Sequence, residues 1–212
     1  MNTMPKTVDL SRGMPPEDFF VCSIPDRTKV EEWRESPEIL DYRIPSSSWC
    51  AMTCISMVLL AEGLSSPALE ELFEQACDAE VYRPMPNDAG WSGAHHDKLP
   101  AFVASVLDQP VQYHPSMTTI DLMRALADGY YALLSVSTDI RLVSNEGPEK
   151  LGGHFVLVYG FEHDEHGNLF FVLNNGAGYA TLNSQVGFRV SEERMLQVFS
   201  GRGVLVRSRH AP

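Results

Sequence analysis

Apolar positions in the first half of the chain recur at helical spacing. Between residues 46 and 127, hydrophobic side chains return every three or four positions and are separated by polar or Gly-rich breaks. This period predicts helices with a buried face. Serines or threonines precede three of these segments and are candidate N-caps. The predicted helices cover residues 46–63, 67–77, 97–107 and 120–127.

Apolar positions after residue 128 instead form short β-branched and aromatic runs, which are typical of strands. A Gly- and Asn-containing segment at 162–168 separates two of the runs and predicts a hairpin. The predicted strands cover residues 111–114, 130–137, 152–160, 169–173 and 203–207, with a short helix at 191–200. Helices first and antiparallel strands second predict an α+β fold.

Length and composition predict one domain. A chain of 212 residues with 44% hydrophobic content can bury about 70% of the surface that its extended form exposes. Residues 1–18 contain three prolines, so we expect an extended N-terminal arm there and a single catalytic domain over residues 19–212. The apolar run at 19–24 predicts an edge strand.

The charge balance limits the possible partners. A net charge of −12 and a pI near 4.9 argue against binding to nucleic acid or to anionic membranes. Such a field suits neutral or cationic substrates, and it also aids solubility. Residues 1–18 do not have the basic start and following apolar run of a secretory signal. No apolar stretch approaches the roughly 18 residues of a membrane span.

The cysteine and histidine positions predict neither a metal site nor a cofactor. Cys22, Cys50, Cys54 and Cys77 follow no metal-ligand spacing. The adjacent histidines at 95–96 have no second cluster of ligands with which to share a metal ion. Reduced thiols in a cytoplasmic protein are the simplest interpretation of these cysteines.

Cys50 is the first candidate for chemistry. It follows Ser46, Ser47 and Ser48 and lies at the start of the first predicted helix. Unpaired backbone N–H groups and the positive end of the helix dipole favour a thiolate there. A cysteine in a buried helix is also commonly a small core residue, so this position alone does not establish a nucleophile.

A histidine and two asparagines far downstream complete the candidate site. His154 opens a strand directly after two glycines, and the next strand ends in Asn174 and Asn175. If these two strands form a hairpin, the start of the first lies beside the end of the second. Cysteine, histidine and an amide form the nucleophile, base and orienter of thiol acyl transfer. Because neighbouring residues on a strand point to opposite faces, either asparagine remains a candidate orienter.

A polar connection joins the strand at 130–137 to His154. This loop is long for a compact domain and leads directly into the candidate base. We therefore expect residues 138–153 to flank a substrate cleft.

Three segments resemble one family of peptidases. Residues 50–57, Cys-Ala-Met-Thr-Cys-Ile-Ser-Met, are similar to the Cys-Gly-x-x-Cys-x-x-Met segment of the bacteriocin-processing, double-glycine peptidases and their stand-alone relatives, which are papain-like. Residues 153–160 resemble that family's Gly-His-Phe-hydrophobic-Gly block, and residues 172–177 its Val-x-Asn-Asp-Pro-Ala block. Gly-Trp-Ser-Gly at 90–93 is a weaker match, and the resemblance covers roughly residues 45–180.

The resemblance implies a papain-like fold with the nucleophile Cys50 on a central helix and the base His154 on an antiparallel sheet. Asn175 would stand where the family has its catalytic aspartate, as papain has asparagine. Two positions differ from the family. Ala51 replaces the glycine that follows the nucleophile, and Ile44 stands where the family has its oxyanion-hole glutamine. The backbone N–H of Cys50 and the three serines at 46–48 are the candidate replacements.

These residues predict thiol-dependent acyl transfer to or from a peptide or acyl substrate. Hydrolysis of the acyl-enzyme would make the protein a cysteine peptidase, which is the reading that the resemblance favours. Capture by an amine would make it an amide-forming acyltransferase. A third alternative is a papain-like binding protein with weak chemistry, because the glutamine is missing. The sequence does not indicate the oligomeric state.

Overall fold

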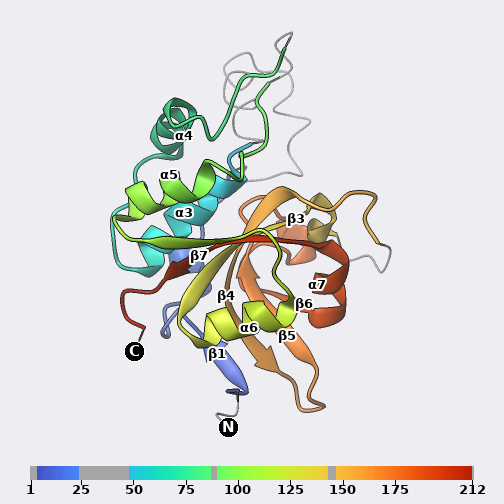
Figure 1. The fold of residues 1–212 in the computed structure, drawn as a ribbon. Helices are drawn as coiled ribbons and strands as arrows, with labels where there is room; N and C mark the ends of the chain where they lie inside the picture. Colours follow the sequence, from blue (N-terminus) through green and yellow to red (C-terminus); the bar gives the residue numbers. More distant parts are fainter. Residues whose placement is uncertain (1–3, 24–47, 87–89, 143–146, 212) are drawn as a thin grey trace.

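A seven-stranded antiparallel sheet lies at the centre of the molecule, with helices on both faces (Figure 1). The computed structural model describes residues 4–23, 48–86, 90–142 and 147–211. The α+β class is confirmed. The helices are η1 (Pro16–Phe19), α3 (Cys50–Ala61), α4 (Leu69–Asp78), α5 (Leu99–Leu107), α6 (Thr119–Ala127), η4 (Thr138–Arg141), η5 (Ala180–Leu182) and α7 (Glu192–Val198). The strands are β1 (Thr7–Asp9), β2 (Val111–His114), β3 (Tyr130–Ser137), β4 (Gly153–His163), β5 (Leu169–Asn174), β6 (Phe188–Ser191) and β7 (Phe199–Arg207).

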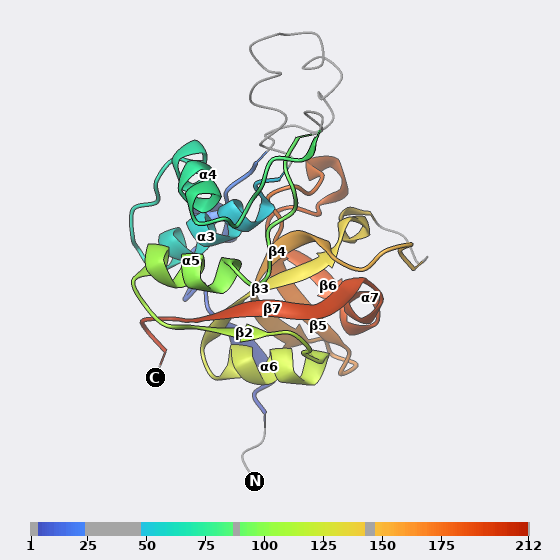
Figure 2. The same cartoon turned by 45° about the horizontal axis from the view of Figure 1, so that its top comes forward.

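The two faces of the sheet bury separate hydrophobic cores. One core joins α3, α4 and α5 to the side chains of Phe155, Leu157 and Tyr159 on β4. The other joins α6 and α7 to the alternate side chains Val156 and Val158. Figure 2 shows α6 and α7 on the side of the sheet away from α3. This alternation is the two-residue period that the apolar runs predicted.

The N-terminal segment differs from the prediction. Residues 1–18 were expected to form an extended arm, but β1 pairs with β4 and so belongs to the sheet. The edge strand expected at 19–24 is wrong for its described part, because Phe19 ends the 3-10 helix η1 and residues 20–23 form no strand. Pro16 at the first helical position and two acidic residues behind it favour that turn. Phe19 is fully buried and packs edge-on against Tyr159, with ring centroids 5.1 Å apart.

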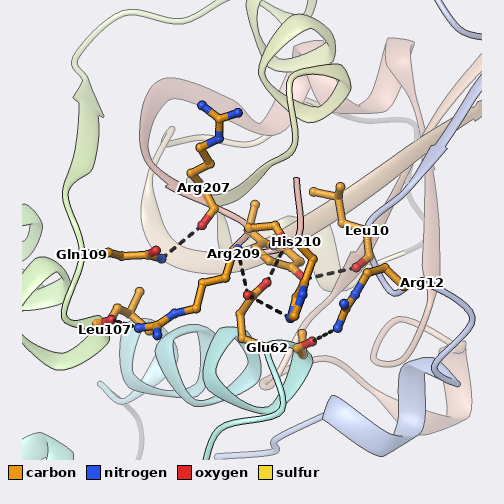
Figure 3. Close-up of polar contacts among 11 residues, drawn as sticks. Leu10, Arg12, Glu62, Leu107, Gln109, Arg207, Arg209 and His210 are labelled. Atoms are coloured by element: carbon orange, nitrogen blue, oxygen red, sulfur yellow. Dashed lines mark hydrogen bonds and ion pairs between the residues drawn. The ribbon is translucent and has the colours of Figure 1, made fainter. Parts of the chain in front are cut away.

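Helix α3 is the buried centre of the first core. Its residues are apolar around almost the whole circumference, and all but Leu60 are buried, as expected for a helix enclosed by other elements. Glu62 follows the helix and is also buried. Its carboxylate accepts hydrogen bonds from the Ser208 hydroxyl at 2.8 Å and from the Arg209 backbone N–H at 2.9 Å (Figure 3). The C-terminal tail therefore anchors the far end of α3.

Strand β4 lies in the middle of the sheet, and its first residues are not paired with β5. Strands β3 and β1 pair along one side of it. On its other side β5 ends at Asn174, which lies opposite Leu157. The first residues of β4, from Gly153 to Val156, therefore extend beyond the end of β5. This end of the sheet is where the start of α3 approaches.

Candidate active site

Cys50 is the first residue of α3 and is 9% exposed. The residue before the helix is Trp49, and no side chain caps it, so the expectation of a serine N-cap is wrong for Ser48. Ser46 and Ser47 lie outside the described residues. The Cys50 thiol faces the backbone carbonyl oxygen of Ser48, with 3.9 Å between Sγ and that oxygen. Ser48 therefore presents its backbone carbonyl to the sulfur.

Burial raises the pKa of the Cys50 thiol above its ordinary value. Several groups oppose this rise, and the largest contribution comes from the backbone N–H of Phe155, followed by the Arg141 guanidinium and the N–H groups of Ala51 and Cys50. The start of α3 therefore favours the thiolate as the sequence predicted, but desolvation outweighs it. The Phe155 contribution indicates that the sulfur lies near the peptide bond that follows His154.

His154 lies on β4 directly after two glycines in the left-handed region, Gly152 at φ +87° and Gly153 at φ +90°. Other residues rarely adopt this conformation, so the glycine pair is required by the turn into the strand. The imidazole is 1% exposed. Its Nε2 lies 2.8 Å from Oδ1 of Asn175. The histidine and one of the two candidate orienters are therefore in direct contact.

The two asparagines have different partners. Asn175 Oδ1 faces His154 and also accepts a hydrogen bond from the Ala177 backbone N–H at 3.2 Å. Asn174 donates from Nδ2 to the Pro16 carbonyl at 3.2 Å, and its Oδ1 accepts from the Gly187 N–H at 2.9 Å. Asn174 thus holds the N-terminal segment to the β5–β6 connection, and Asn175 holds the histidine.

Gly176 brings the Asn175 turn close to α3. A Cβ atom at this position would lie 2.8 Å from Oγ1 of Thr53 and 2.6 Å from the carbonyl oxygen of Val21. The Thr53 hydroxyl itself donates to the Cys50 carbonyl at 2.8 Å. The absence of a side chain at Gly176 therefore lets the end of β5 approach the first turn of α3.

Two residues near the thiol were not identified from the sequence. Arg141 ends η4, and its Nη2 lies 3.3 Å from Nδ1 of His154. Tyr82 is 1% exposed, and burial together with the neighbouring Cys50 raises its pKa well above the ordinary value. Tyr82 lies in the connection between α4 and α5, and its neighbour Val81 is also buried. Only the aromatic and β-branched character of this pair indicated burial.

A cavity of about 550 Å³ opens beside the histidine strand. Its lining includes Ser137, Thr138, Lys150, Gly152 and Gly153, which all belong to β3, β4 or the connection between them. Cys50, His154 and Asn175 are not among its lining residues, so the expectation that residues 138–153 flank a substrate cleft stays a prediction. Residues 143–146 of that loop lie outside the described part of the chain.

The described residues contain no group of three or more His, Cys, Asp or Glu side chains that could hold a metal ion. Within the same residues, no helix has both the length and the apolar character needed to cross a membrane.

Comparison with known proteins identifies the fold. No family profile and no curated protein matches the chain. Among solved structures, a C39-like peptidase from Bacillus anthracis aligns with a TM-score of 0.56 at 15% identity, over 97% of this chain and 100% of that one. Procathepsin L 3 from the larval midgut of Tenebrio molitor aligns with a TM-score of 0.55 at 15% identity, over 96% and 70%. The bromelain protease of Ananas comosus aligns with a TM-score of 0.51 at 12% identity, over 95% and 97%. The chain therefore has the papain-like fold that its sequence motifs predicted.

Proposed function

We propose that this protein is a cysteine peptidase-like hydrolase in which Cys50 is the nucleophile, His154 the base and Asn175 the orienter of the base. The observation that carries the proposal is the buried contact between His154 Nε2 and Asn175 Oδ1, on the strand whose next peptide N–H favours the Cys50 thiolate. Similarity to peptidases at 12–15% identity supports the scaffold only, so the chemistry rests on these contacts.

The proposed reaction begins with loss of the thiol proton. Cys50 gives its proton to Nδ1 of His154 as the sulfur bonds to the carbonyl carbon of the substrate. The tetrahedral intermediate collapses to a thioester when the bond to the amine breaks, and His154 returns the proton to that amine. A water molecule, deprotonated by the same nitrogen, then attacks the thioester carbon; the bond to sulfur breaks, the acid is released, and the proton returns from Nδ1 to the Cys50 sulfur.

The oxyanion needs N–H donors in place of the family's glutamine. The Cys50 backbone N–H lies at the start of α3, where the first N–H groups have no partner within the helix. One such donor is worth about 3 kcal/mol of transition-state stabilisation. We assign this N–H as the first donor, and the serines at 46–48 remain candidates for the second.

The test is site-resolved alkylation with limiting iodoacetamide, read by peptide mapping. Cys50 of the wild type should react several-fold faster than Cys54, whose pKa burial raises well above the ordinary value. His154→Ala should remove most of this difference because the thiol loses its proton acceptor. Equal labelling of both cysteines in both proteins would refute the nucleophile assignment.

The same thioester can be resolved by an amine, which would make the protein an acyltransferase. Incubating the enzyme with a peptide that it cleaves and with a primary amine distinguishes hydrolysis from acyl transfer. A hydrolase releases acid at a rate that the amine does not change, whereas an acyltransferase forms amide at the expense of acid. Cys50→Ser is the control that should form neither product. If the wild type forms neither product and Cys50 shows no fast alkylation, the protein is better described as a binding protein.

A further inference from the structure

Arg141 contacts the histidine of the proposed site and acts electrostatically on the thiol. It lies at the end of η4, directly after β3, and β3 carries Val136 opposite His154 in the sheet. Its Nη2 is 3.3 Å from Nδ1 of His154. The same guanidinium acts on Cys50, where its positive charge favours the thiolate. A half-buried cation thus stands at the nitrogen that would receive the thiol proton.

The hydrogen bonds around His154 determine where its proton lies. Oδ1 of Asn175 accepts from the Ala177 N–H, so the amide oxygen faces the ring and Nε2 of His154 must donate to it. In a neutral ring Nδ1 then carries the lone pair. A guanidinium can only donate, so its contact with Nδ1 fits the neutral Nε2–H tautomer. An imidazolium would direct an N–H at a cation.

The other titratable groups near the pair do not provide this charge. Cys54 and Tyr82 face Cys50, but burial raises the pKa of each well above its ordinary value, so both stay neutral at neutral pH. His96 lies 5.4 Å from the Phe155 ring, and its pKa is lowered, first by burial and then by Arg202. Arg202 lies beside Gly152, where its Nη2 would be 2.8 Å from an added Cβ, and its charge acts on His96.

We propose that Arg141 is a positioning residue of the reaction, which holds His154 of the free protein as the neutral Nε2–H tautomer and favours ionisation of Cys50. The proposal rests on the proposed function, because it assigns Cys50 and His154 the roles given there. It adds that the resting pair is a thiol and a neutral imidazole beside a permanent cation. The proton passes from Sγ to Nδ1 when the guanidinium leaves that nitrogen.

The charge of Arg141 should affect two titrations in a way that simple structural support would not. A cation makes a thiol easier to ionise and an imidazole harder to protonate. Removing it should therefore raise the titration midpoints of both Cys50 and His154, by about 1 to 3 pH units if the charge lies within about 4 to 6 Å of each group. Loosened packing would not raise both together, because better hydration lowers the midpoint of a buried thiol.

The experiment follows both groups in the intact protein. The pH dependence of Cys50 alkylation gives the thiol midpoint, and ¹⁵N NMR of the labelled imidazole gives the tautomer and midpoint of His154. The variants are Arg141→Gln, which removes the charge, and Arg141→Lys, which keeps it. Arg202→Gln is the matched control, because it removes a guanidinium that acts on His96 instead. Thermal unfolding is recorded for each protein.

The expected result is an Nε2–H tautomer in the wild type, a rise of both midpoints in Arg141→Gln, a smaller rise in Arg141→Lys and none in Arg202→Gln. Unchanged midpoints in Arg141→Gln, or a wild-type ring protonated at Nδ1, would overturn the proposal. If Arg141→Gln does not fold, the wild-type tautomer and the lysine variant decide. The proposed function is tested separately by His154→Ala, so Cys50 activation that depends on His154 but not on Arg141 refutes this inference alone.

Discussion

Asn174 and Asn175 form a matched pair in which stability and chemistry can be separated. Both side chains are fully buried, and each makes two hydrogen bonds. Only Asn175 contacts His154. Asn174→Ala and Asn175→Ala should therefore both reduce stability, whereas only Asn175→Ala should change the histidine.

The magnitude follows from the groups left behind. Asn175→Ala leaves the His154 Nε2–H and the Ala177 N–H buried without an acceptor, and each such group costs about 1 to 3 kcal/mol. Asn174→Ala leaves the Pro16 carbonyl and the Gly187 N–H without their side-chain partner at partly buried positions, where water can replace part of the lost bonds. We expect about 2 to 6 kcal/mol for Asn175→Ala, which for a chain of this size lowers Tm by about 4 to 24 °C, and a loss toward the lower end of this range for Asn174→Ala.

The chemical effect should differ by much more than the stability effect. Without Asn175 the imidazole loses the acceptor that fixes its orientation, and misplacement of a catalytic group can reduce the rate about 100-fold. Cys50 alkylation at neutral pH should fall at least several-fold in Asn175→Ala and stay near the wild-type rate in Asn174→Ala. Both proteins are assayed well below their measured Tm, so that unfolding does not contribute.

Asn175→Asp provides a second comparison. The carboxylate restores an acceptor for Nε2, and its negative charge should raise the midpoint of His154, which NMR titration measures directly. The orienter assignment is wrong if Asn174→Ala abolishes Cys50 reactivity while Asn175→Ala preserves it. Equal losses in both variants at equal stability would assign the effect to the β5 turn as a whole.

Four further predictions follow from individual contacts. Cys50→Ser should remove the fast-labelling site and change the unfolding free energy by less than about 1 kcal/mol, since the two side chains are similar in size; a larger change in urea unfolding would mean that the sulfur is mainly a packing group. Gly153→Ala should cost about 1 to 3 kcal/mol because of φ +90°, whereas Gly147→Ala, with no atom within 4 Å of the new Cβ, should be neutral in the same assay. Burial raises the pKa of Cys77 to about 11, so its alkylation rate should increase roughly tenfold per pH unit from neutral pH up to that value and then level off; a plateau below about pH 9 would contradict it. Glu62→Gln should lower Tm by several degrees, because one of the two acceptor oxygens that hold the C-terminal tail becomes a donor, and an unchanged Tm would show that the tail contributes little.

Local patterns predicted most of the fold. The run at 130–137 became strand β3 with the same limits, because a buried central strand needs apolar residues on both faces. Thr118 caps α6 with a capping box, in which its side chain bonds the Asp121 N–H and the Asp121 carboxylate bonds back. β1 was missed because three residues are too few to show a period. Its place depends on Gly160, where a Cβ would lie 2.5 Å from the Val8 carbonyl oxygen.

Only part of the candidate site could be predicted from the sequence, because some of its residues are brought together by local strand pairing and others by contacts between distant segments. His154 and the two asparagines could be brought together from the hairpin alone, since antiparallel pairing fixes which ends meet. Choosing between Asn174 and Asn175 needed the partners of each side chain. Arg141 could not be found from its own surroundings, because the loop around it is polar and its contact depends on the pairing of β3 with β4.

The ionisation of Cys50 shows why a local rule can predict the wrong direction for a pKa shift. A helix N-terminus stabilises a nearby negative charge by about 0.3 to 1 kcal/mol at exposed sites and by up to about 2 kcal/mol when partly buried. Full burial can shift a pKa by as much as 3 to 5 units, and each unit is worth about 1.4 kcal/mol. Desolvation therefore exceeds the helix effect, as the raised pKa of Cys50 shows. Groups outside the helix must supply the difference, and the two that contribute most, the Phe155 N–H and the Arg141 guanidinium, come from strand β4 and from the loop before it. The reactivity of this thiol is therefore a property of the approach between α3 and β4, and changes at that contact should alter it more than changes within the helix.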